Sequence, residues 1–287
     1  MNIALFADVH GRILLSFKLC ARWERETGEH IELILQAGDL GAFPDMSRLD
    51  RATIKYAQKD PTELGFMHDF AEYRQEVAAV LEQTTCNMVF VRGNHEDHVW
   101  LDQLEQQTKG PVFPVDAYQR VYCLKTGMLY SFCVDGVELH VLGIGRIGAP
   151  DGLAERDATK YLQAYEFERL CSLDQQQIDL LLTHDSAKDC VTLGYGMAEI
   201  REVLNTYRPT YHFYGHTGQP YVEQRDTNGQ TLSGKLSDLT WGKAAEGYQL
   251  LPCSMGILRW NGPDDYSFEP VTQSWFGEYT AHTWQHL

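Results

Sequence analysis

The sequence has no feature that would place it in a membrane or in a disulfide-stabilised scaffold. It contains no run of eighteen or more apolar residues, so no membrane span is expected. Its seven cysteines are scattered and never form a C-x-x-C pair, which argues against a zinc knuckle or a disulfide framework. The first residues run into a strand-like segment without the basic and apolar regions of a signal peptide. We therefore expect a cytoplasmic protein with reduced thiols.

Clustered positive charge is also missing. The chain has 24 basic and 40 acidic residues, a formal net charge of −16, and no lysine- or arginine-rich cluster marks a basic groove. Such a surface repels nucleic acid at long range, because affinity for phosphate backbones comes mainly from basic side chains. This lowers the expectation of a nucleic acid substrate but leaves room for a nucleotide or a short strand in a local groove. Bound divalent cations would offset part of the charge.

No linker or internal repeat divides the chain, so we expect one domain over residues 1–287. Apolar, β-branched strand signals recur at residues 2–8, 31–39, 87–94, 178–185 and 210–216. Helical periodicity occurs at residues 13–26, 157–171 and 197–207. Residues 41–84 form an insertion, for which we expect a loop in the first half and a helix in the second.

The second half of the chain is richer in hairpin signals. Asp135-Gly136 joins two β runs within residues 128–145, and Asn228-Gly229 marks a second hairpin in the β-rich C-terminal part, residues 220–287. Alternating strands and helices followed by hairpins predict two packed mixed sheets with helices on the outside. The aromatic-rich end of the chain is expected to pack on the body or on a second subunit.

Polar side chains of metal-binding type follow five of the predicted strands. They are Asp8, His10, Asp39, Asn94, His95, His184 and His216. Each alone is an ordinary turn or capping residue, but sites in α/β sheets form beyond the carboxyl ends of strands, where distant turns converge. Carboxylates, imidazoles and an amide oxygen suit divalent ions such as Mn²⁺, Fe²⁺ or Zn²⁺. One carboxylate could bridge two ions that clamp a phosphate ester.

Five motifs in order resemble those of the calcineurin-like metallophosphoesterases. They are DVH at 8–10, GDLG at 38–41, RGNHE at 92–96, THD at 183–185 and GHTG at 215–218. The resemblance runs from residue 3 to about residue 220. It implies a four-layer α/β/β/α sandwich of two mixed β-sheets flanked by helices, with a binuclear metal centre at one edge.

The resemblance also implies a role for each matching residue. The metal ligands would be Asp8, His10, Asp39, Asn94, His184 and His216. Asp39 would bridge the two ions, His95 would be the general acid or a phosphate contact, and a metal-bound hydroxide would attack phosphorus. Substrate contacts are expected from Arg92, Asn94 and His95, although Arg92 could equally brace the site.

One position departs from the family pattern. The family usually has G-H-x-H, with the second histidine on the first metal, whereas this chain has Gly218 at that place. The first site is therefore expected to be weaker, with water or a distant residue replacing the histidine. The candidates are Gln219, Glu223, His282 and His286.

These features favour a metal-dependent phosphoesterase with two divalent ions. Mn²⁺ is the first choice, with Fe²⁺, Zn²⁺ or Ni²⁺ as alternatives. The substrate would be a phosphorylated small molecule, a nucleotide or a nucleic acid end, and a loose resemblance to RNA lariat debranching enzymes slightly favours phosphodiesters. A phosphomonoesterase or protein phosphatase, and a degenerate member that binds a protein partner, stay open as alternatives. No feature indicates an oligomeric state.

The insertion is where selectivity is expected. Long loops in compact domains are often lids or binding loops. Its segment 41–70 carries aromatic and basic side chains, among them Arg51 and Lys55. A packed surface insertion is the alternative.

Overall fold

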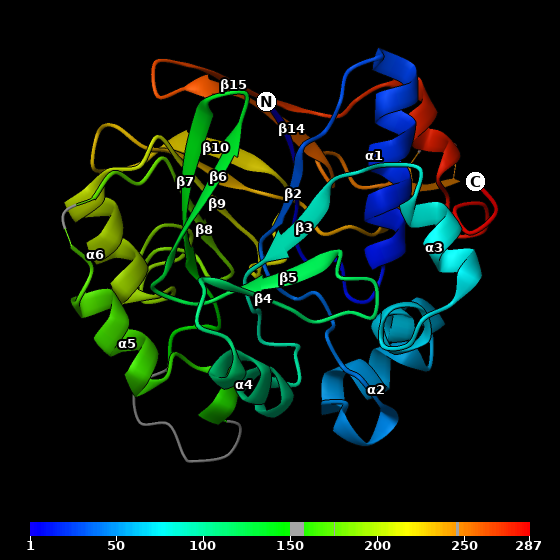
Figure 1. Cartoon of the computed structure of the whole chain (residues 1–287), viewed down its shortest axis with the longest axis horizontal. Coiled ribbons are helices and arrows are strands. Elements are labelled where there is room, and N and C mark those ends of the chain that lie inside the picture. The colour runs from blue at the N-terminus through cyan, green and yellow to red at the C-terminus, as the bar shows by residue number, and fades with distance from the viewer. Residues whose placement is uncertain (150–157, 175, 245–246) are drawn as a thin grey trace.

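Two large β-sheets stand face to face, with helices on both outer sides (Figure 1). The computed structural model describes residues 1–149, 158–174, 176–244 and 247–287. The first sheet has the strand order β15-β14-β1-β2-β3-β5-β4, and the second has the order β10-β11-β9-β8-β7-β6. Both sheets mix parallel and antiparallel pairs, which confirms the predicted fold class.

The first sheet is built around three parallel strands whose apolar side chains are buried on both faces. Strands β1, β2 and β3 pair in parallel in register, and β3 continues to β5. Strand β14 pairs antiparallel with β1 and forms a hairpin with β15. The strands of this sheet are β1 (Asn2–Phe6), β2 (Leu33–Gln36), β3 (Asn87–Phe90), β4 (Val112–Pro114), β5 (Val121–Leu124), β14 (Gly256–Gly262) and β15 (Asp265–Pro270).

The second sheet also has a parallel centre, formed by β7, β8, β9 and β11. The β6–β7 hairpin turns at Asp135 and Gly136, whose φ angles are 52° and 80°, as a tight primed turn requires. Both predicted hairpins are confirmed, since β10 and β11 also pair antiparallel. The strands are β6 (Leu129–Val134), β7 (Val137–Ile144), β8 (Leu180–Thr183), β9 (Tyr211–Tyr214), β10 (Val222–Arg225) and β11 (Leu232–Lys235).

The helices complete the two outer layers. They are α1 (Ile13–Thr27), α2 (Arg51–Ala57), α3 (Gln75–Leu81), α4 (His98–Gln107), α5 (Ala164–Cys171) and α6 (Ala198–Tyr207). A separate small hairpin joins β12 (Trp241–Ala244) to β13 (Gly247–Leu250). Short 3₁₀ or π turns occur at Met46–Arg48, Pro61–Leu64, Phe66–Phe70, Ala158–Lys160 and Ser274–Glu278. None of the helices in the described ranges is long and apolar enough to cross a bilayer.

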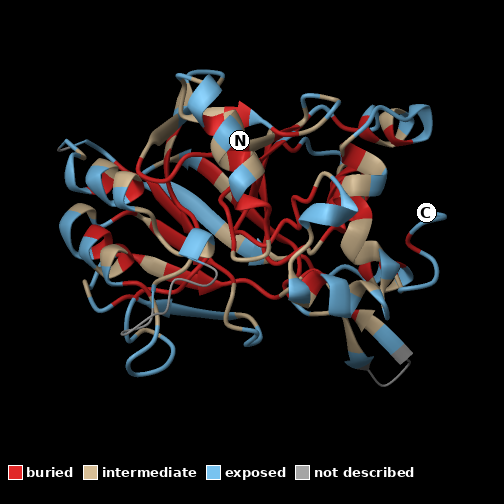
Figure 2. Ribbon diagram, turned by 90° about the horizontal axis from the view of Figure 1, so that it is seen from below, coloured by how far each residue is buried: buried red, intermediate tan, exposed pale blue. Residues whose placement is uncertain are grey.

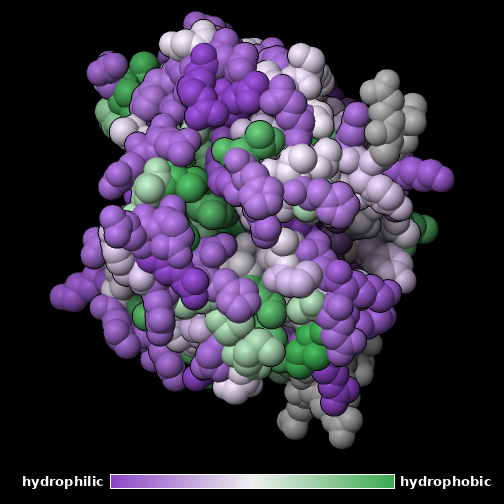
Figure 3. Space-filling model, turned by 90° about the vertical axis from the view of Figure 1, so that its right-hand side faces the viewer, coloured by the Kyte–Doolittle hydropathy of each residue, from purple (hydrophilic) through white to green (hydrophobic). Residues whose placement is uncertain are grey.

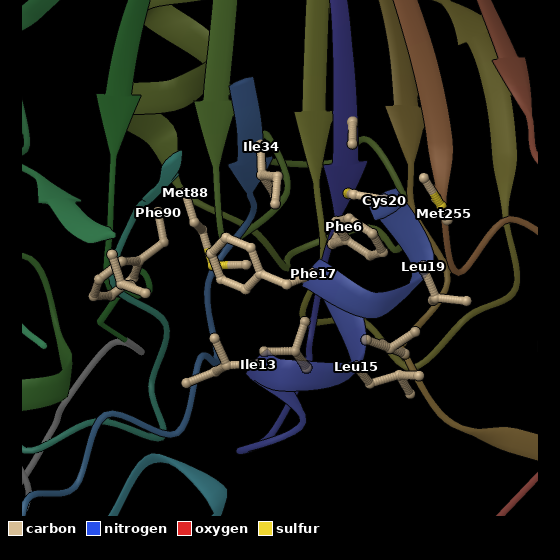
Figure 4. Close-up of a cluster of buried hydrophobic side chains, with 14 of the residues drawn as sticks. Phe6, Ile13, Leu15, Phe17, Leu19, Cys20, Ile34, Met88, Phe90 and Met255 are labelled. Atoms are coloured by element: carbon tan, nitrogen blue, oxygen red, sulfur yellow. The ribbon is translucent and has the colours of Figure 1, made fainter. Parts of the chain in front are cut away.

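Three apolar clusters hold these layers together, and the buried residues concentrate in the strands (Figure 2). Between the first sheet and α1, Ile13 and Phe17 of the helix meet Phe6, Ile34 and Met88 of the strands (Figure 4). A second cluster fills the space between the sheets, and a third lies under α5 and α6. Burying these side chains supplies the main driving force for folding, at about 25 cal/mol per Å² of apolar surface.

The insertion differs from the expected loop followed by a helix. Its first half contains α2, which Asp50 caps by accepting a hydrogen bond from the Thr53 amide at 2.7 Å. Its second half breaks into short turns before α3 instead of forming one long helix. The expectation for the first half was wrong because a seven-residue helix is too short for its periodicity to stand out.

The C-terminal tail packs on the body, as one of the two expected alternatives proposed. Trp275, Phe276, Tyr279 and Trp284 belong to the same buried cluster as α1. Lys18 of α1 donates hydrogen bonds to the Trp284 and Gln285 carbonyls at 3.0 and 2.9 Å. The face of the molecule on this side is mostly hydrophilic, with apolar side chains in small groups (Figure 3).

Candidate metal centre

The carboxyl ends of the parallel strands in both sheets bring the predicted ligands to one edge. Ligand atoms of Asp8, His10 and Asp39 lie within 4.8 Å of one another, and so do those of Asp39, His184 and His216. Asp39 belongs to both groups. The turns after β1, β2, β8 and β9 therefore build two adjoining clusters of metal-ligand type that share one carboxylate.

The two oxygens of Asp39 face opposite clusters. Oδ1 lies 3.3 Å from His184 Nε2 and accepts hydrogen bonds from the Asn94 and His95 amides at 2.7 and 2.8 Å. Oδ2 lies 3.9 Å from His10 Nε2. Burial alone would raise the pKa of Asp39, but the imidazoles of His184, His10 and His95 hold it well below its usual value. Asp39 is thus held as an ionised carboxylate between the two clusters.

The surroundings of His184 fit a divalent cation. Its Nδ1 lies 3.0 Å from the Ala37 carbonyl, which can only accept, so this nitrogen carries the proton. Its Nε2 lies 3.1 Å from Asn94 Oδ1 and 3.3 Å from Asp39 Oδ1. Burial lowers the pKa of His184 to about 3, which keeps the ring neutral. Three electron-pair donors therefore face one another, an arrangement that a cation between them would stabilise.

The opposite cluster is also arranged around a buried carboxylate. The His216 amide donates to both oxygens of Asp8, at 3.2 and 3.1 Å. Burial and the neighbouring carboxylates of Asp238 and Asp39 raise the pKa of Asp8 well above its usual value. Behind His10, Glu63 Oε2 lies 3.9 Å from Nδ1, on the side away from Asp39. A carboxylate placed in this way can orient a metal-binding imidazole.

Strained backbone accompanies these ligands. Asp8, His10, Asp39 and His216 have φ angles of 47°, 43°, 53° and 63°, in the left-handed region that side-chain-bearing residues rarely occupy. Such strain persists only where surrounding structure holds it, and it concentrates at functional sites. The turns after β1, β2 and β9 thus hold four of the candidate ligands in this conformation, which Asp and His adopt more readily than most residues.

His95 faces the metal cluster from the insertion side. Its ring centroid is 5.6 Å from that of His10, and its Nδ1 lies 2.7 Å from Asp50 Oδ2. Burial lowers the pKa of His95, but the Asp50 hydrogen bond and the Asp39 charge outweigh it and raise the pKa to about 9. His95 is therefore protonated at neutral pH and able to donate a proton. The sequence reasoning missed Asp50, because it lies inside the insertion, outside every motif.

Two other motif residues brace the site. Glu96 accepts hydrogen bonds from the Leu40 and Ala42 amides at 2.8 and 2.6 Å, which ties the turn after β3 to the turn after β2. Arg92 is 1% exposed, and its terminal nitrogens each lie 2.5 Å from an oxygen of Asp102 or Glu105. The guanidinium of Arg92 is therefore used internally, whereas the sequence prediction also allowed a contact with substrate. This arrangement supports the alternative bracing role.

Gly218 lies in an open cavity of about 340 Å³ together with Asp8, His10, Asp39 and His216. The four residues suggested as replacement ligands do not line it. Gln219 lines a neighbouring cavity, and Glu223, His282 and His286 are exposed elsewhere on the surface. Asp238, which sequence reasoning did not single out, lines the cavity instead.

Comparisons with known proteins agree with this geometry. A family model described as calcineurin-like phosphoesterase matches residues 1–220. The crystal structure of TT1561 of Thermus thermophilus has a similar fold, with a TM-score of 0.53 and 14% identity over 94% of this chain and 99% of that one. GAP50 of Plasmodium, described as the anchor in the inner membrane complex, has a TM-score of 0.50 and 12% identity over 95% and 84%. No curated protein gives a significant match.

The structural neighbours share the fold at low identity, while the family model covers most of the chain, including all five motifs and every predicted metal ligand. The buried carboxylates and imidazoles of the two clusters are ligand types that divalent ions accept. The chain belongs to the calcineurin-like phosphoesterase family.

Proposed function

We propose that the protein is a metal-dependent phosphoesterase that holds two divalent ions and hydrolyses phosphate esters, with a preference for phosphodiesters. The observation that carries this proposal is the position of Asp39 between two clusters of ligand type. A carboxylate in this position can place one oxygen on each ion. The bound ions would lower the pKa of water and neutralise the charge that develops on phosphorus.

The chain's own residues would hold and orient the reacting groups. Asp8 and His10 lie on one side of Asp39, while Asn94, His184 and His216 lie on the other. His95 would donate a proton to the leaving oxygen, since the hydrogen bond to Asp50 favours the protonated form of its ring. Asp50 would also orient the ring. Glu96 would keep the two turns in register.

Two cavities flank the metal edge and support the diester preference. One, of about 570 Å³, is lined by Asn94, His95 and the insertion residue Arg51. The other, of about 680 Å³, is lined by His216, Tyr161 and Tyr195. A phosphodiester carries two organic groups, and each could occupy one of these cavities. The cavity beside Arg51 would suit an anionic group, and the one beside the tyrosines would suit an aromatic or planar group.

The test compares bis(p-nitrophenyl) phosphate with p-nitrophenyl phosphate across a Mn²⁺ titration of metal-free protein. We expect Mn²⁺-dependent hydrolysis of both esters, with the higher kcat/KM for the diester. Faster hydrolysis of the monoester would overturn the diester preference. No hydrolysis of either ester at any Mn²⁺ concentration, together with no bound metal, would overturn the enzymatic proposal and favour a family member that binds a protein partner.

A further inference from the structure

Gly218 leaves open space in front of the first metal cluster. Its φ of +62° suits glycine, and a Cβ built at this position meets no atom within 4 Å. None of the described residues therefore fills the place where a second histidine would project. The cluster of Asp8, His10 and Asp39 needs a further ligand from some other part of the chain or from water.

A sixth strand end supplies a candidate. Strand β11 runs parallel to β9, so its carboxyl end lies at the same edge as the other ligand-bearing turns. Asp238 follows this strand and forms a parallel bridge with Ala7, the residue before Asp8. The Leu239 amide donates to the Ala7 and Asp8 carbonyls, both at 3.3 Å. These contacts fix the Asp238 backbone beside the first ligand.

One carboxylate oxygen of Asp238 is free of hydrogen bonds among the described residues, but the side chain lies outside the group of Asp8, His10 and Asp39 whose ligand atoms are within 4.8 Å of one another, so an ion would have to draw it inward. Oδ1 of Asp238 lies 3.3 Å from Nζ of Lys235, while no described residue donates a hydrogen bond to Oδ2. Lys235 is 1% exposed, so it holds the carboxylate from the buried side.

The carboxylates of Asp8, Asp39 and Asp238 share the cavity with Glu63, and the guanidinium of Arg12, which also lines it, is paired with Asp60 and Glu63. A cation among the carboxylates of Asp8, Asp39 and Asp238 would relieve their repulsion.

We propose that Asp238 is a ligand of the first metal and takes the place left open at Gly218. The inference rests on the proposed function, because it requires that this edge binds two ions. The first site then has carboxylates from Asp8, Asp39 and Asp238 and a single imidazole from His10. Such an oxygen-rich set favours a hard ion such as Mn²⁺ or Mg²⁺ over Zn²⁺, whereas the second site, with two imidazoles, suits Zn²⁺ better.

The first experiment counts bound ions by equilibrium dialysis against Mn²⁺ and elemental analysis. Wild type is expected to bind two ions per chain. Asp238→Asn and Asp238→Ala should each keep the second ion and lose affinity for the first, by about 10- to 100-fold. The amide still offers an oxygen, so the loss should be smaller in Asp238→Asn than in Asp238→Ala. Asp264→Asn, an exposed change of the same charge in the β14–β15 turn, is the matched control.

The outcomes separate the two proposals. Wild type that binds no ion overturns the proposed function and this inference with it. Wild type that binds two ions, with unchanged affinities in both Asp238 variants, overturns this inference alone. Equal losses of first-site affinity in Asp238→Asn and Asp238→Ala would also overturn it. They would indicate that the charge of Asp238 attracts the ion from a distance without coordinating it. Thermal unfolding of each metal-free variant checks that losing the partner of Lys235 has not unfolded the protein.

A second experiment tests the chemistry of the ligand. Asp238→His changes an oxygen donor to a nitrogen donor at the same position, so the first site should shift its preference from Mn²⁺ towards Zn²⁺ in a competition dialysis. An unchanged Mn²⁺ to Zn²⁺ ratio at that site would contradict coordination by residue 238.

Discussion

The two halves of the candidate metal centre are built differently. In the nitrogen-rich half, formed by Asn94, His184 and His216, the side chain of His184 is 0% exposed, while Asn94 and His216 are half-buried. The oxygen-rich half, formed by Asp8, His10 and Asp238, opens to solvent, with His10 and Asp238 exposed by 26% and 31%. Packing thus holds the His184 imidazole in place before any ion binds, whereas in the other half the buried carboxylate of Asp8 lies near those of Asp39 and Asp238.

This difference has consequences for how each half would bind its ion. In the nitrogen-rich half the Ala37 carbonyl fixes the tautomer of His184. The imidazole is therefore already oriented before an ion binds. In the oxygen-rich half the side chains of His10 and Asp238 are partly exposed and less firmly held, so binding an ion would require ordering them. The ion would gain binding energy by neutralising the carboxylates. Ions in the exposed half should therefore exchange faster and respond more strongly to salt.

The largest expected effect comes from the residue that both halves share. Asp39→Asn should remove both ions and lower turnover by about 10³-fold or more, because an amide cannot supply two charged oxygens. Metal content and kcat measured on the same preparation check this. Loss of only one ion would show that the halves are independent and that Asp39 does not bridge them.

A second variant tests proton transfer independently of metal binding by either half of the site. His95→Ala should leave the ion count unchanged and lower kcat by roughly 10²- to 10⁴-fold, the range for a lost general acid. Asp50→Asn, which removes the partner of the ring, should shift the alkaline limb of the pH profile to lower pH. A His95→Ala protein that also loses metal would place His95 among the ligands.

The cavity beside the insertion should respond more weakly. Arg51 is exposed and lines the cavity that also contains His95. Arg51→Ala should raise KM for an anionic phosphodiester by about tenfold, equivalent to about 1.4 kcal/mol, with little change in kcat. Lys59→Ala, an exposed change on the same segment, is the control. Equal KM values for the two variants would show that Arg51 is a solvated surface charge.

The last prediction concerns acid stability on the nitrogen-rich side, where the effect at neutral pH is the smallest of the four and grows only as the pH falls. His212 lies under this half, with Nε2 2.9 Å from Thr183 Oγ1, and burial lowers its pKa from 6.5 to about 3. The folded state therefore binds fewer protons than the unfolded state between these values. Stability should fall as the pH drops below about 6.5, by at most about 1.4 kcal/mol per pH unit.

Urea unfolding of the metal-free protein at pH 7.5, 6.0 and 5.0 measures this slope. His212→Gln should reduce it, whereas His282→Gln, on the exposed tail, should leave it unchanged. A slope that is identical in the three proteins would contradict the assignment of the acid sensitivity to His212.

The sequence was most informative where a ligand follows a strand directly. Asp8, Asp39, His184 and His216 each come one to three residues after a buried strand, so the strand pattern alone places them at one edge. Asp50 and Asp238 were not predicted as site residues, because their positions depend on tertiary contacts. Asp50 reaches His95 only through the path of the insertion, and Asp238 reaches Asp8 only because β11 joins β9 in parallel after a hairpin.

The same limit applies to Arg92, for which the sequence left a substrate contact and a bracing role equally open. Its motif position is next to Asn94 and His95, but the side chain of a strand-end residue can point to either face. Here it turns inward to carboxylates on α4 that the sequence does not place nearby.

The left-handed backbone at Asp8, His10, Asp39 and His216 lowers the stability of the fold, while the side chains at these positions are the candidate metal ligands. Each of these conformations costs roughly 1–2 kcal/mol relative to a residue that adopts it freely. Glycine at any of the four positions would relax the chain while deleting a ligand. A laboratory selection for thermal survival alone would thus enrich inactive variants at these turns, and a selection that also requires metal would retain the strained residues.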